Sequence, residues 1–369
     1  MSIKPIIAHS SVFGAKRAYD KMTGVVNTAV VETGFHTFNR YMDVMKNRMQ
    51  SLSSGIPTRS FSELPVTMRS SVRMGSPLED TLMESIDSIK TLITPRRGLY
   101  ATSYGAKDMT RRDDISSRYD TMNSGFVMGF DEEIAPSVLI GATMGHSVTR
   151  LAMQDLDDVG QIRGYQASLY GTYTKGAGYV NALLGYGIND HSIKREVPAF
   201  AVNRSAQSTY KSHIVSAYTE GGLRLPVSSL DVMPLVGFQA SHIHRGSFTE
   251  TGAKDLNLSV DSQSYLSLVS SLGVRVRKEI TFGEGSFIPE VKLCWDHDFS
   301  NDDRSMKASL AGLPSMNITP EKEDADRLVT KMSLAYKGTS NLFFHLSYEN
   351  SLSSSKEEHA GTMGVRYRW

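Results

Sequence analysis

From Gly98 to the C-terminal Trp369, apolar and polar side chains alternate with a period of two. In the last run, Met363 and Val365 fall on one side of the backbone and Gly364 falls on the other. Successive side chains of an extended strand point to opposite faces, so the pattern predicts strands with one apolar and one polar face. About 12 such runs occur, near residues 99–106, 123–131, 137–147, 164–174, 178–190, 212–225, 230–244, 263–278, 287–299, 326–337, 341–352 and 359–369.

The polar faces of these runs favour a membrane barrel over a soluble β-sandwich, which also alternates but buries its apolar faces. They are rich in glycine and serine with scattered charges, which suits the crowded polar lumen of a barrel. Short turns such as 175–178 alternate with long loops such as 148–163 and 191–211, as in transmembrane barrels. Aromatic residues lie at strand ends, where interface girdles require them: Tyr186, Trp295, Tyr348, Tyr367 and Trp369. The sequence therefore predicts an all-β transmembrane barrel of about 12 antiparallel strands, with a soluble sandwich as the alternative.

Charged side chains on the polar faces are candidates for the lumen wall of this barrel. They are Glu220, Arg275, Arg277, Glu290, Lys292, Asp296, Asp298, Glu349 and Arg366. Asp296 and Asp298 share one face of a run, an arrangement that acid–base catalysis can use. In a barrel we expect them instead to balance Lys292, Arg275 or Arg277 across the lumen.

Residues 1–97 lack the alternation and form a helical N-terminal segment and linker ahead of the barrel domain, residues 98–369. Apolar side chains at spacings of three and four predict a helix over residues 35–50. They are Phe35, Phe38, Met42, Met45 and Met49. This helix is amphipathic, because polar residues cover its remaining faces.

The flanks of this helix carry weaker signals. We expect residues 12–32 to be helical as well, with Gly34 as a weak point between the two segments. Residues 51–75 are rich in Ser, Arg, Gly and Pro, which predicts a linker. Ser76 followed by proline and, two residues later, glutamate predicts the start of a second helix over 76–91.

The composition excludes several classes of site. The 40 Lys and Arg residues nearly balance the 39 Asp and Glu residues, so no charge excess points to nucleic acid. The single cysteine, Cys294, excludes a disulfide framework and a multi-cysteine metal cage, and we expect an inert thiol. No apolar stretch reaches about 20 residues, so no transmembrane helix is expected. Residues 1–10 lack the apolar run of an export signal, and we expect none there.

Short strings across residues 98–369 resemble, in their order and spacing, the C-terminal β-domain of type V autotransporters. No single string is specific, and the resemblance depends on their order. They are Gly125–Asp131, Ile140–Ser147, Ala182–Gly187, Phe248–Gly252, Ser264–Leu268, Ser271–Arg275, Ile288–Phe299 and Gly364–Trp369. His146 departs from the pattern, since it stands where the family usually has tyrosine.

The resemblance implies a translocator in the outer membrane of a Gram-negative type of cell. Such a barrel anchors an N-terminal passenger segment and helps export it through the pore. The implied partners are outer-membrane lipid, the barrel assembly machinery, periplasmic chaperones and the chain's own passenger segment, with no nucleic acid. The assembly machinery reads the terminal strand of the family, which implies that role for Val365, Tyr367 and Trp369. Alternatively, Trp369 serves only as a girdle aromatic.

The family also threads a helix through the pore, and the resemblance implies that role for residues 35–50. The side chains expected inside the lumen are Phe35, Phe38, Asn39, Arg40, Met42, Met45 and Arg48. Basic residues of this helix can meet acidic residues of the wall. The expected basic residues are Arg40, Lys46 and Arg48, and their expected partners are Glu220, Glu290 and Glu349. Some family members cut themselves at an asparagine in this helix, but the usual paired-Asn junction is missing here, so we expect no self-cleavage.

Two other functions remain open at this stage. One is an outer-membrane enzyme barrel, a protease or lipase, and the other is a passive porin or adhesin. His242 and His244 share one face of a run, but no third ligand stands nearby, so we expect no metal site. We also expect no catalytic residues and no cofactor. Residues 1–34 show no β-helix repeat, and the passenger stays unidentified.

Overall fold

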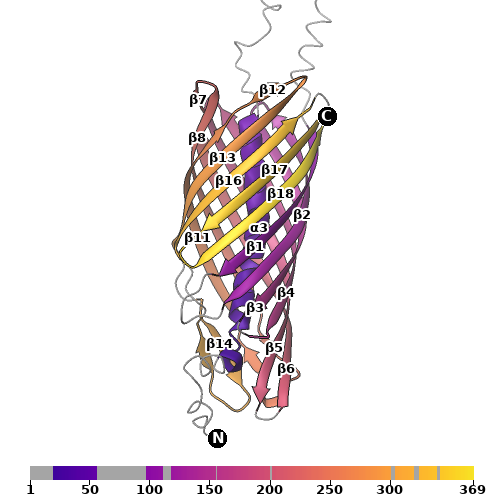
Figure 1. The fold of residues 1–369 in the computed structure, drawn as a ribbon, viewed down its shortest axis with the longest axis vertical. Helices are drawn as coiled ribbons and strands as arrows, with labels where there is room; N and C mark the ends of the chain where they lie inside the picture. The colour runs from indigo at the N-terminus through magenta and orange to yellow at the C-terminus, as the bar shows by residue number, and fades with distance from the viewer. Residues whose placement is uncertain are drawn as a thin grey trace, which may run out of the picture.

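The computed structural model describes residues 20–55, 97–110, 118–154, 156–199, 202–300, 304–319, 324–338 and 341–369. In Figure 1 these residues form a closed β-barrel that encloses a long helix. The second helix predicted over 76–91, most of the linker predicted over 51–75, and residues 12–19 lie outside the described residues.

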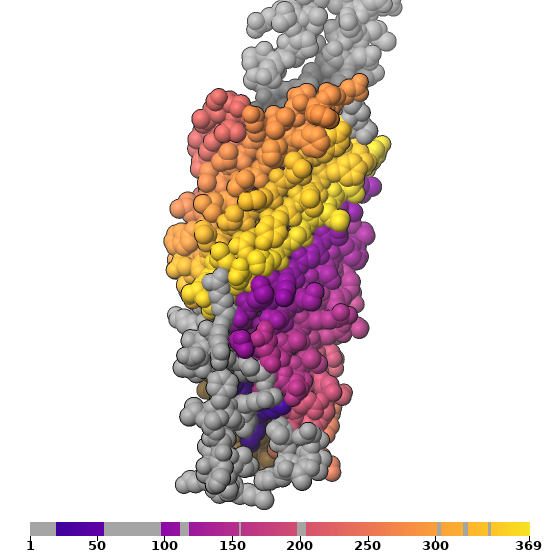
Figure 2. Space-filling view, in the orientation of Figure 1, coloured from indigo at the N-terminus to yellow at the C-terminus, as the bar shows by residue number. Residues whose placement is uncertain are grey.

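Twelve long strands make the wall, and each pairs antiparallel with the next wall strand along the chain. They are β1 (Arg97–Thr110), β2 (Tyr119–Ala135), β3 (Val138–Met153), β4 (Val159–Lys175), β5 (Gly178–Ala199), β6 (Val202–Leu223), β8 (Leu230–Arg245), β11 (Gln263–Arg277), β13 (Gly285–Asp298), β16 (Asp326–Lys337), β17 (Leu342–Leu352) and β18 (Lys356–Arg368). The last strand pairs with the first, with Gly98 opposite Arg368. Figure 2 shows this seam, where yellow β18 lies against purple β1. The wall therefore has no free edge, and the predicted barrel of about 12 strands with a helix ahead of it is confirmed.

The two ends of the barrel differ. At one end, here called the short-turn end, strands join through tight turns, two of them extended by short strands, β7 (Leu225–Val227) and β12 (Ile280–Phe282). The other end, here called the long-loop end, carries a small four-stranded sheet and one 3-10 turn. These are β9 (Phe248–Thr249), η2 (Lys254–Leu256), β10 (Leu258–Val260), β14 (Met306–Leu310) and β15 (Met316–Ile318).

The prediction of long loops over 148–163 and 191–211 is wrong. Strand β3 continues to Met153, β4 begins at Val159, and the β5–β6 hairpin extends past the rest of the wall, as Figure 1 shows. Outward side chains of the hairpin become polar from Asp190 onward, which ends the apolar alternation. Backbone pairing continues there, because hydrogen bonds of the ladder do not depend on side-chain polarity.

The outer face of the barrel is apolar on every wall strand. Each strand exposes at least one large apolar side chain: Leu99, Met122, Met144, Leu169, Leu184, Val215, Phe238, Leu272, Leu293, Met332, Leu346 and Met363. The inner face instead buries serine, threonine, asparagine and charged side chains. A continuous apolar outer band with a polar interior is the arrangement of a barrel that faces lipid.

The helix inside the barrel is α3 (Val26–Gly55), which at 1.5 Å per residue spans roughly 45 Å. It is longer than the predicted 35–50, and it includes residues expected in the linker. The prediction that the helix is interrupted at Gly34 is wrong, since α3 continues through this residue without a break. A β-carbon at this glycine would lie 2.6 Å from the ring of His191, so Gly34 serves close approach to the wall. The chain turns instead at Gly24, where φ is 71°. No helix in the described ranges is long and apolar enough to cross a bilayer.

Candidate functional site: the lumen and its helix

The apolar face of α3 packs on one side of the lumen, formed by β2 to β6. Phe38, Met42, Met45 and Met49 are fully buried in one cluster with wall tyrosines and aliphatic side chains. The wall makes room for them with strand glycines. A β-carbon on Gly187 would lie 2.5 Å from the Phe38 ring. This side of the lumen, here called the packed wall, therefore holds the helix by shape and apolar contact.

Arg40 connects α3 to the opposite side of the lumen. Its guanidinium donates to Glu349 at 2.9 Å and forms a second ion pair with Glu358. All three side chains are buried, and a buried charge is tolerated only when it is paired. The expected pairing of Arg40 with a wall glutamate falls on Glu349, and Glu358 was not foreseen.

Arg48 meets Asp131 of β2, which differs from the expected partners Glu220, Glu290 and Glu349. Asp131 is fully buried, and it also accepts hydrogen bonds from Arg366 at 2.6 Å and from Tyr170 at 3.1 Å. The Arg48 guanidinium lies over the ring of Tyr100, 4.4 Å from its centroid. The alternation places Asp131 on a polar face, but sequence reasoning did not select it. Its level along the barrel axis, which matches that of Arg48, depends on the fold and cannot be read from the alternation.

The C-terminal end of α3 lies in a cradle of arginines. Arg275 donates to the Gln50 carbonyl at 3.1 Å and to the Ser54 hydroxyl at 2.9 Å, and Arg277 donates to the Ser54 carbonyl at 2.5 Å. The last carbonyls of a helix have no partners within the helix, and cations complement the negative end of its dipole. Glu220 accepts from the Gln50 amide at 2.5 Å, so this expected partner of a basic residue meets an amide instead.

The remaining predicted charges lie on the inner face, with partners that correct the expectation. Arg327 pairs with Asp296 at 2.9 Å, and Arg304 lies 3.5 Å from Asp298. Neither aspartate pairs with Arg275 or Arg277, because those arginines serve the helix end together with their own carboxylate partners. Those partners are Glu290 at 2.7 Å and Asp231 at 3.1 Å.

Other predicted residues are placed as follows. Lys292 lines a narrow cavity with Glu220 and Glu349, and Lys46 pairs within the helix with Asp43 at 3.0 Å. The amide of Asn39 accepts a hydrogen bond from Gln239 at 2.9 Å. The terminal side chains Val365, Tyr367 and Trp369 project outward with 37%, 49% and 48% of their surface exposed. No cluster of three or more metal-ligating residues occurs in the part of the chain that the structure describes.

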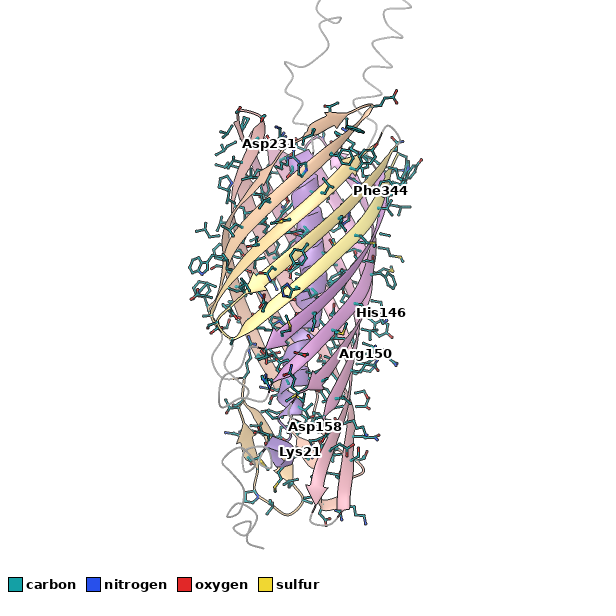
Figure 3. The ribbon with its side chains drawn as sticks, viewed as in Figure 1. Lys21, His146, Arg150, Asp158, Asp231 and Phe344 are labelled. Atoms are coloured by element: carbon teal, nitrogen blue, oxygen red, sulfur yellow. The ribbon has the colours of Figure 1, made fainter. Side chains whose placement is uncertain are left out.

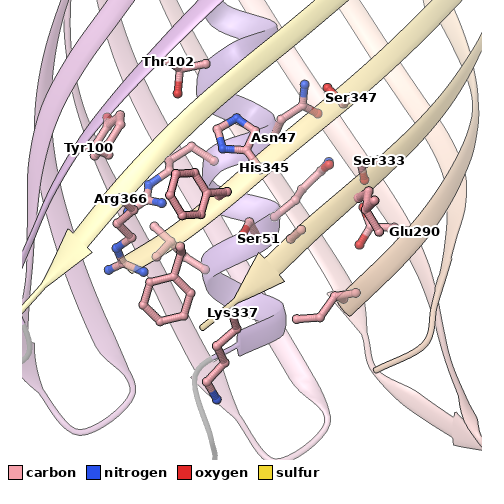
Figure 4. Close-up of a pocket in the computed structure, with 18 of the residues that line it drawn as sticks. Asn47, Ser51, Tyr100, Thr102, Glu290, Ser333, Lys337, His345, Ser347 and Arg366 are labelled. Carbon is pink, nitrogen blue, oxygen red and sulfur yellow. The ribbon is translucent and has the colours of Figure 1, made fainter. Parts of the chain in front are cut away.

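The helix leaves space on the side of β13, β16, β17 and β18, here called the open wall. Figure 4 shows this region, a cavity of about 250 Å³ at the short-turn end. Its lining combines helix residues, Asn47 and Ser51, with wall residues, Glu290, Lys331 and His345. The open wall meets the helix mainly through charged side chains, in contrast to the packed wall.

A second enclosure surrounds the first turns of α3 at the long-loop end. Arg195 and Glu250 form a fully buried ion pair there, and Glu250 also accepts from the Asn27 amide at 3.3 Å. Apolar side chains of β9, β10 and β14 pack around Val26 and Val30. Nearby, in the loop ahead of β4, burial raises the pKa of Asp158 to about 6. Sequence reasoning missed this enclosure, here called the collar, because Arg195 falls in a stretch that was expected to be a loop and the other wall residues come from short segments between wall strands.

The chain matches the family described as "Autotransporter beta-domain" over residues 99–349. It is 24% identical over 264 residues to "Outer membrane protein A" of Rickettsia conorii, which covers 68% of this chain and 13% of that protein. It is 21% identical over 275 residues to "Extracellular serine protease" of Serratia marcescens, which covers 74% of this chain and 26% of that protein. The chain thus spans a minor part of the length of these relatives.

Solved structures of autotransporter domains share the fold. The translocator domain of the autotransporter NalP from Neisseria meningitidis superimposes with a TM-score of 0.62 at 16% identity, over 79% of this chain and 96% of that one. The β domain of the Bordetella autotransporter BrkA gives a TM-score of 0.58 at 16% identity, over 74% and 99% of the two chains. At this identity the likeness concerns the fold alone.

Proposed function

Because this chain belongs to the family of autotransporter β-domains, it is an outer-membrane β-barrel translocator of type V secretion, and we propose that α3 closes the pore after the segment ahead of it has been exported. Residues 98–369 would act as the anchor and translocator, and residues 1–97 would comprise the end of the passenger, the pore helix and a linker. The pore helix would act through Phe35, Phe38, Asn39, Arg40, Met42, Met45 and Arg48.

The direction of α3 is the observation that carries this proposal. Its first turns lie at the long-loop end, where Asn27 contacts Glu250, and its last turn lies at the short-turn end, where Ser54 contacts Arg277. Figure 3 places Lys21, just ahead of α3, at the long-loop end as well. A chain leaving the helix toward its N-terminus therefore emerges where the long loops lie, the outer side of such barrels.

The proposed mechanism is conformational. A polar wall with many hydrogen-bonding groups can solvate an extended chain in transit, and the same groups then pair with Arg40 and Arg48 when the helix settles. We propose no chemical step. The name of the Serratia relative, "Extracellular serine protease", refers to the whole protein, of which the match covers 26%. Any enzymatic activity would then reside in a passenger.

The test is surface display by intact cells. An epitope tag at the N-terminus of the full chain should become accessible to antibody and external protease, while the barrel keeps its heat-dependent gel mobility. A Thr37→Cys, Thr149→Cys pair in a Cys294→Ser background should form a disulfide between helix and wall, since the two hydroxyls lie 2.7 Å apart. A folded barrel with a tag that stays inaccessible would contradict the export proposal.

We further propose that the terminal strand is an assembly signal for the barrel assembly machinery, reached with the help of periplasmic chaperones. Val365, Tyr367 and Trp369 present an apolar, aromatic strand face to the outside, which supports this role. Tyr367→Ser with Trp369→Ser should reduce insertion in cells and leave refolding into detergent intact. Equal losses in both assays would assign these residues to the girdle alone.

A further inference from the structure

Six histidines lie on the outer face of the barrel, all near one end. They are His146, His213, His242, His244, His297 and His359. On each strand that carries one, the histidine lies on the long-loop side of the large exposed apolar side chains. Strand β13 is an example, where Val291, Leu293 and Trp295 precede His297. These histidines therefore mark the long-loop rim of the lipid-facing band.

The short-turn rim has a different composition. Its outward side chains include six large apolar or aromatic residues, Leu99, Ile134, Tyr173, Phe282, Phe344 and Trp369, beside the charged residues Arg97 and Lys175. Among the described residues no histidine lies on the outer face at that rim. Figure 3 shows His146 at the outer edge of the barrel, on the long-loop side of Phe344. The asymmetry requires an explanation, because an aromatic girdle alone would serve both interfaces equally.

Three of these histidines gather on two neighbouring strands. His213 of β6 is directly opposite His244 of β8, and His242 shares the outer face of β8 with His244. Side chains directly opposite each other in an antiparallel pair have β-carbons about 4.5–5.5 Å apart. Lys211, with 67% of its side chain exposed, lies two residues beyond His213 on the same face. These four residues are called the histidine patch below.

Hydroxyl groups of neighbouring strands orient two imidazoles of the patch. Nδ1 of His213 lies 2.9 Å from the Tyr186 hydroxyl, and Nδ1 of His244 lies 2.8 Å from the Ser264 hydroxyl. When each hydroxyl donates to Nδ1, the ring proton resides on Nε2, the nitrogen at the far side of the ring. Both imidazoles then offer an N–H donor to the membrane interface in their neutral form.

The three other rim histidines do not offer a free N–H donor to the membrane interface. Nδ1 of His146 contacts the Gly164 carbonyl at 2.9 Å, and Nδ1 of His297 contacts Asp326 at 2.8 Å. Both partners accept, so in the neutral ring Nε2 carries a lone pair and no proton. Nδ1 of His359 lies 2.7 Å from the Tyr348 hydroxyl, as in the patch, but its Nε2 already lies 3.3 Å from Glu357. Among the rim histidines that the structure describes, the patch alone therefore combines free N–H donors with an exposed ammonium group.

We propose that the histidine patch binds the terminal phosphate of a lipid in the outer leaflet. A terminal phosphate has several acceptor oxygens and a negative charge, which match two imidazole N–H donors and the Lys211 ammonium. Lys211 also faces Asp190 at 3.4 Å, but an exposed pair of this kind contributes little and leaves the ammonium available. The position of the patch, at the rim of the apolar band, is where lipid headgroups lie. This inference requires the outer-membrane location and is independent of passenger export.

The test is lipid retention by the full chain, refolded in detergent and measured by native mass spectrometry. The probes are phosphatidic acid, which has a terminal phosphate, and phosphatidylglycerol, which has only a phosphodiester. The wild-type protein should retain phosphatidic acid several-fold more than phosphatidylglycerol. A patch variant, His213→Phe with His242→Phe and His244→Phe, should lose this preference, and its heat-dependent gel mobility should show that it folds.

The matched control makes the same three replacements at His146, His297 and His359, and should keep the preference. If the control loses as much as the patch variant, or if the patch variant retains phosphatidic acid like the wild type, the proposal is wrong. A second variant, Tyr186→Phe with Ser264→Ala, keeps every histidine and removes the orienting hydroxyls. It should weaken retention, and it gives an independent answer should the triple variant fail to fold.

Discussion

The packed wall and the open wall hold the same helix by different means. Strand β5 places Gly185 and Gly187 against Phe38 and Met42, with no room for an added methyl group at either glycine. The open wall leaves a cavity and reaches the helix through Arg40 and its two glutamates. Close apolar packing is possible in only one position of the helix. The charged groups beside a polar cavity can instead exchange their ion-pair partners for water. The comparison teaches that one wall fixes the position of the helix by fit and the other leaves space beside it.

The largest effect is expected where the open wall depends on one cation. Arg40→Met leaves Glu349 and Glu358 buried, at 9% and 6% exposure, without their partner. Breaking a buried pair from one side costs about 3–5 kcal/mol, because the remaining charge is uncompensated. We expect a loss of this size in the free energy of unfolding in lipid vesicles, measured by urea titration of the heat-resistant gel band.

The control for this prediction removes the whole network. Arg40→Met combined with Glu349→Gln and Glu358→Gln should recover most of the loss, since no buried charge is left alone. If the single and triple variants unfold alike, the open wall is hydrated enough to tolerate free carboxylates, and the ion pairs do not hold the helix.

A loss of similar size is expected on the packed wall. Phe38 is fully buried against β5. Phe38→Ala removes the ring and leaves a cavity, because the paired strands around it cannot move inward to fill the space. Deleting a buried aromatic side chain costs about 3 kcal/mol or more. The same urea titration measures it, and Phe38→Leu, which keeps most of the volume, should cost under about 1.5 kcal/mol. Equal costs for both variants would show that the groove is not shaped for the ring.

The fit of the packed wall can also be tested from the strand side. Gly187→Ala places a methyl group 2.5 Å from the Phe38 ring, and overpacking of this kind costs about 1–3 kcal/mol. The matched control is Gly361→Ala on β18, where the added carbon meets only a carbonyl oxygen 4.0 Å away. Urea midpoints should fall for the first variant and stay unchanged for the second. A shift in both would point to a general effect on strands.

Sequence reasoning predicts the barrel and the apolar side of the helix, and it predicts partners poorly. Alternation shows which face of a strand Glu349 occupies, and a spacing of three and four shows which face of the helix Phe38 occupies. Neither pattern gives the register and tilt of the strands, and these decide which charged side chains come into contact. For this reason the expectation that Arg48 meets a wall glutamate is wrong, and Arg48 pairs with Asp131, 83 positions away. The collar around Arg195 and Glu250 escapes such reasoning, because Arg195 lies on the part of β5 whose outward side chains are polar, and Glu250 lies in a segment without a period.

The smallest effect is expected where the helix faces the open cavity. Ser51 is exposed on α3 and lines that cavity, so Ser51→Leu adds volume where space exists. Substitutions away from close contacts usually change stability by less than about 0.5 kcal/mol, and we expect the urea midpoint to stay within that range. The larger side chain should still narrow the route beside the helix and lower the ion conductance of the plugged barrel in planar bilayers. A destabilisation as large as that of Phe38→Ala would mean that the helix contacts both walls closely, and the distinction between them would fail.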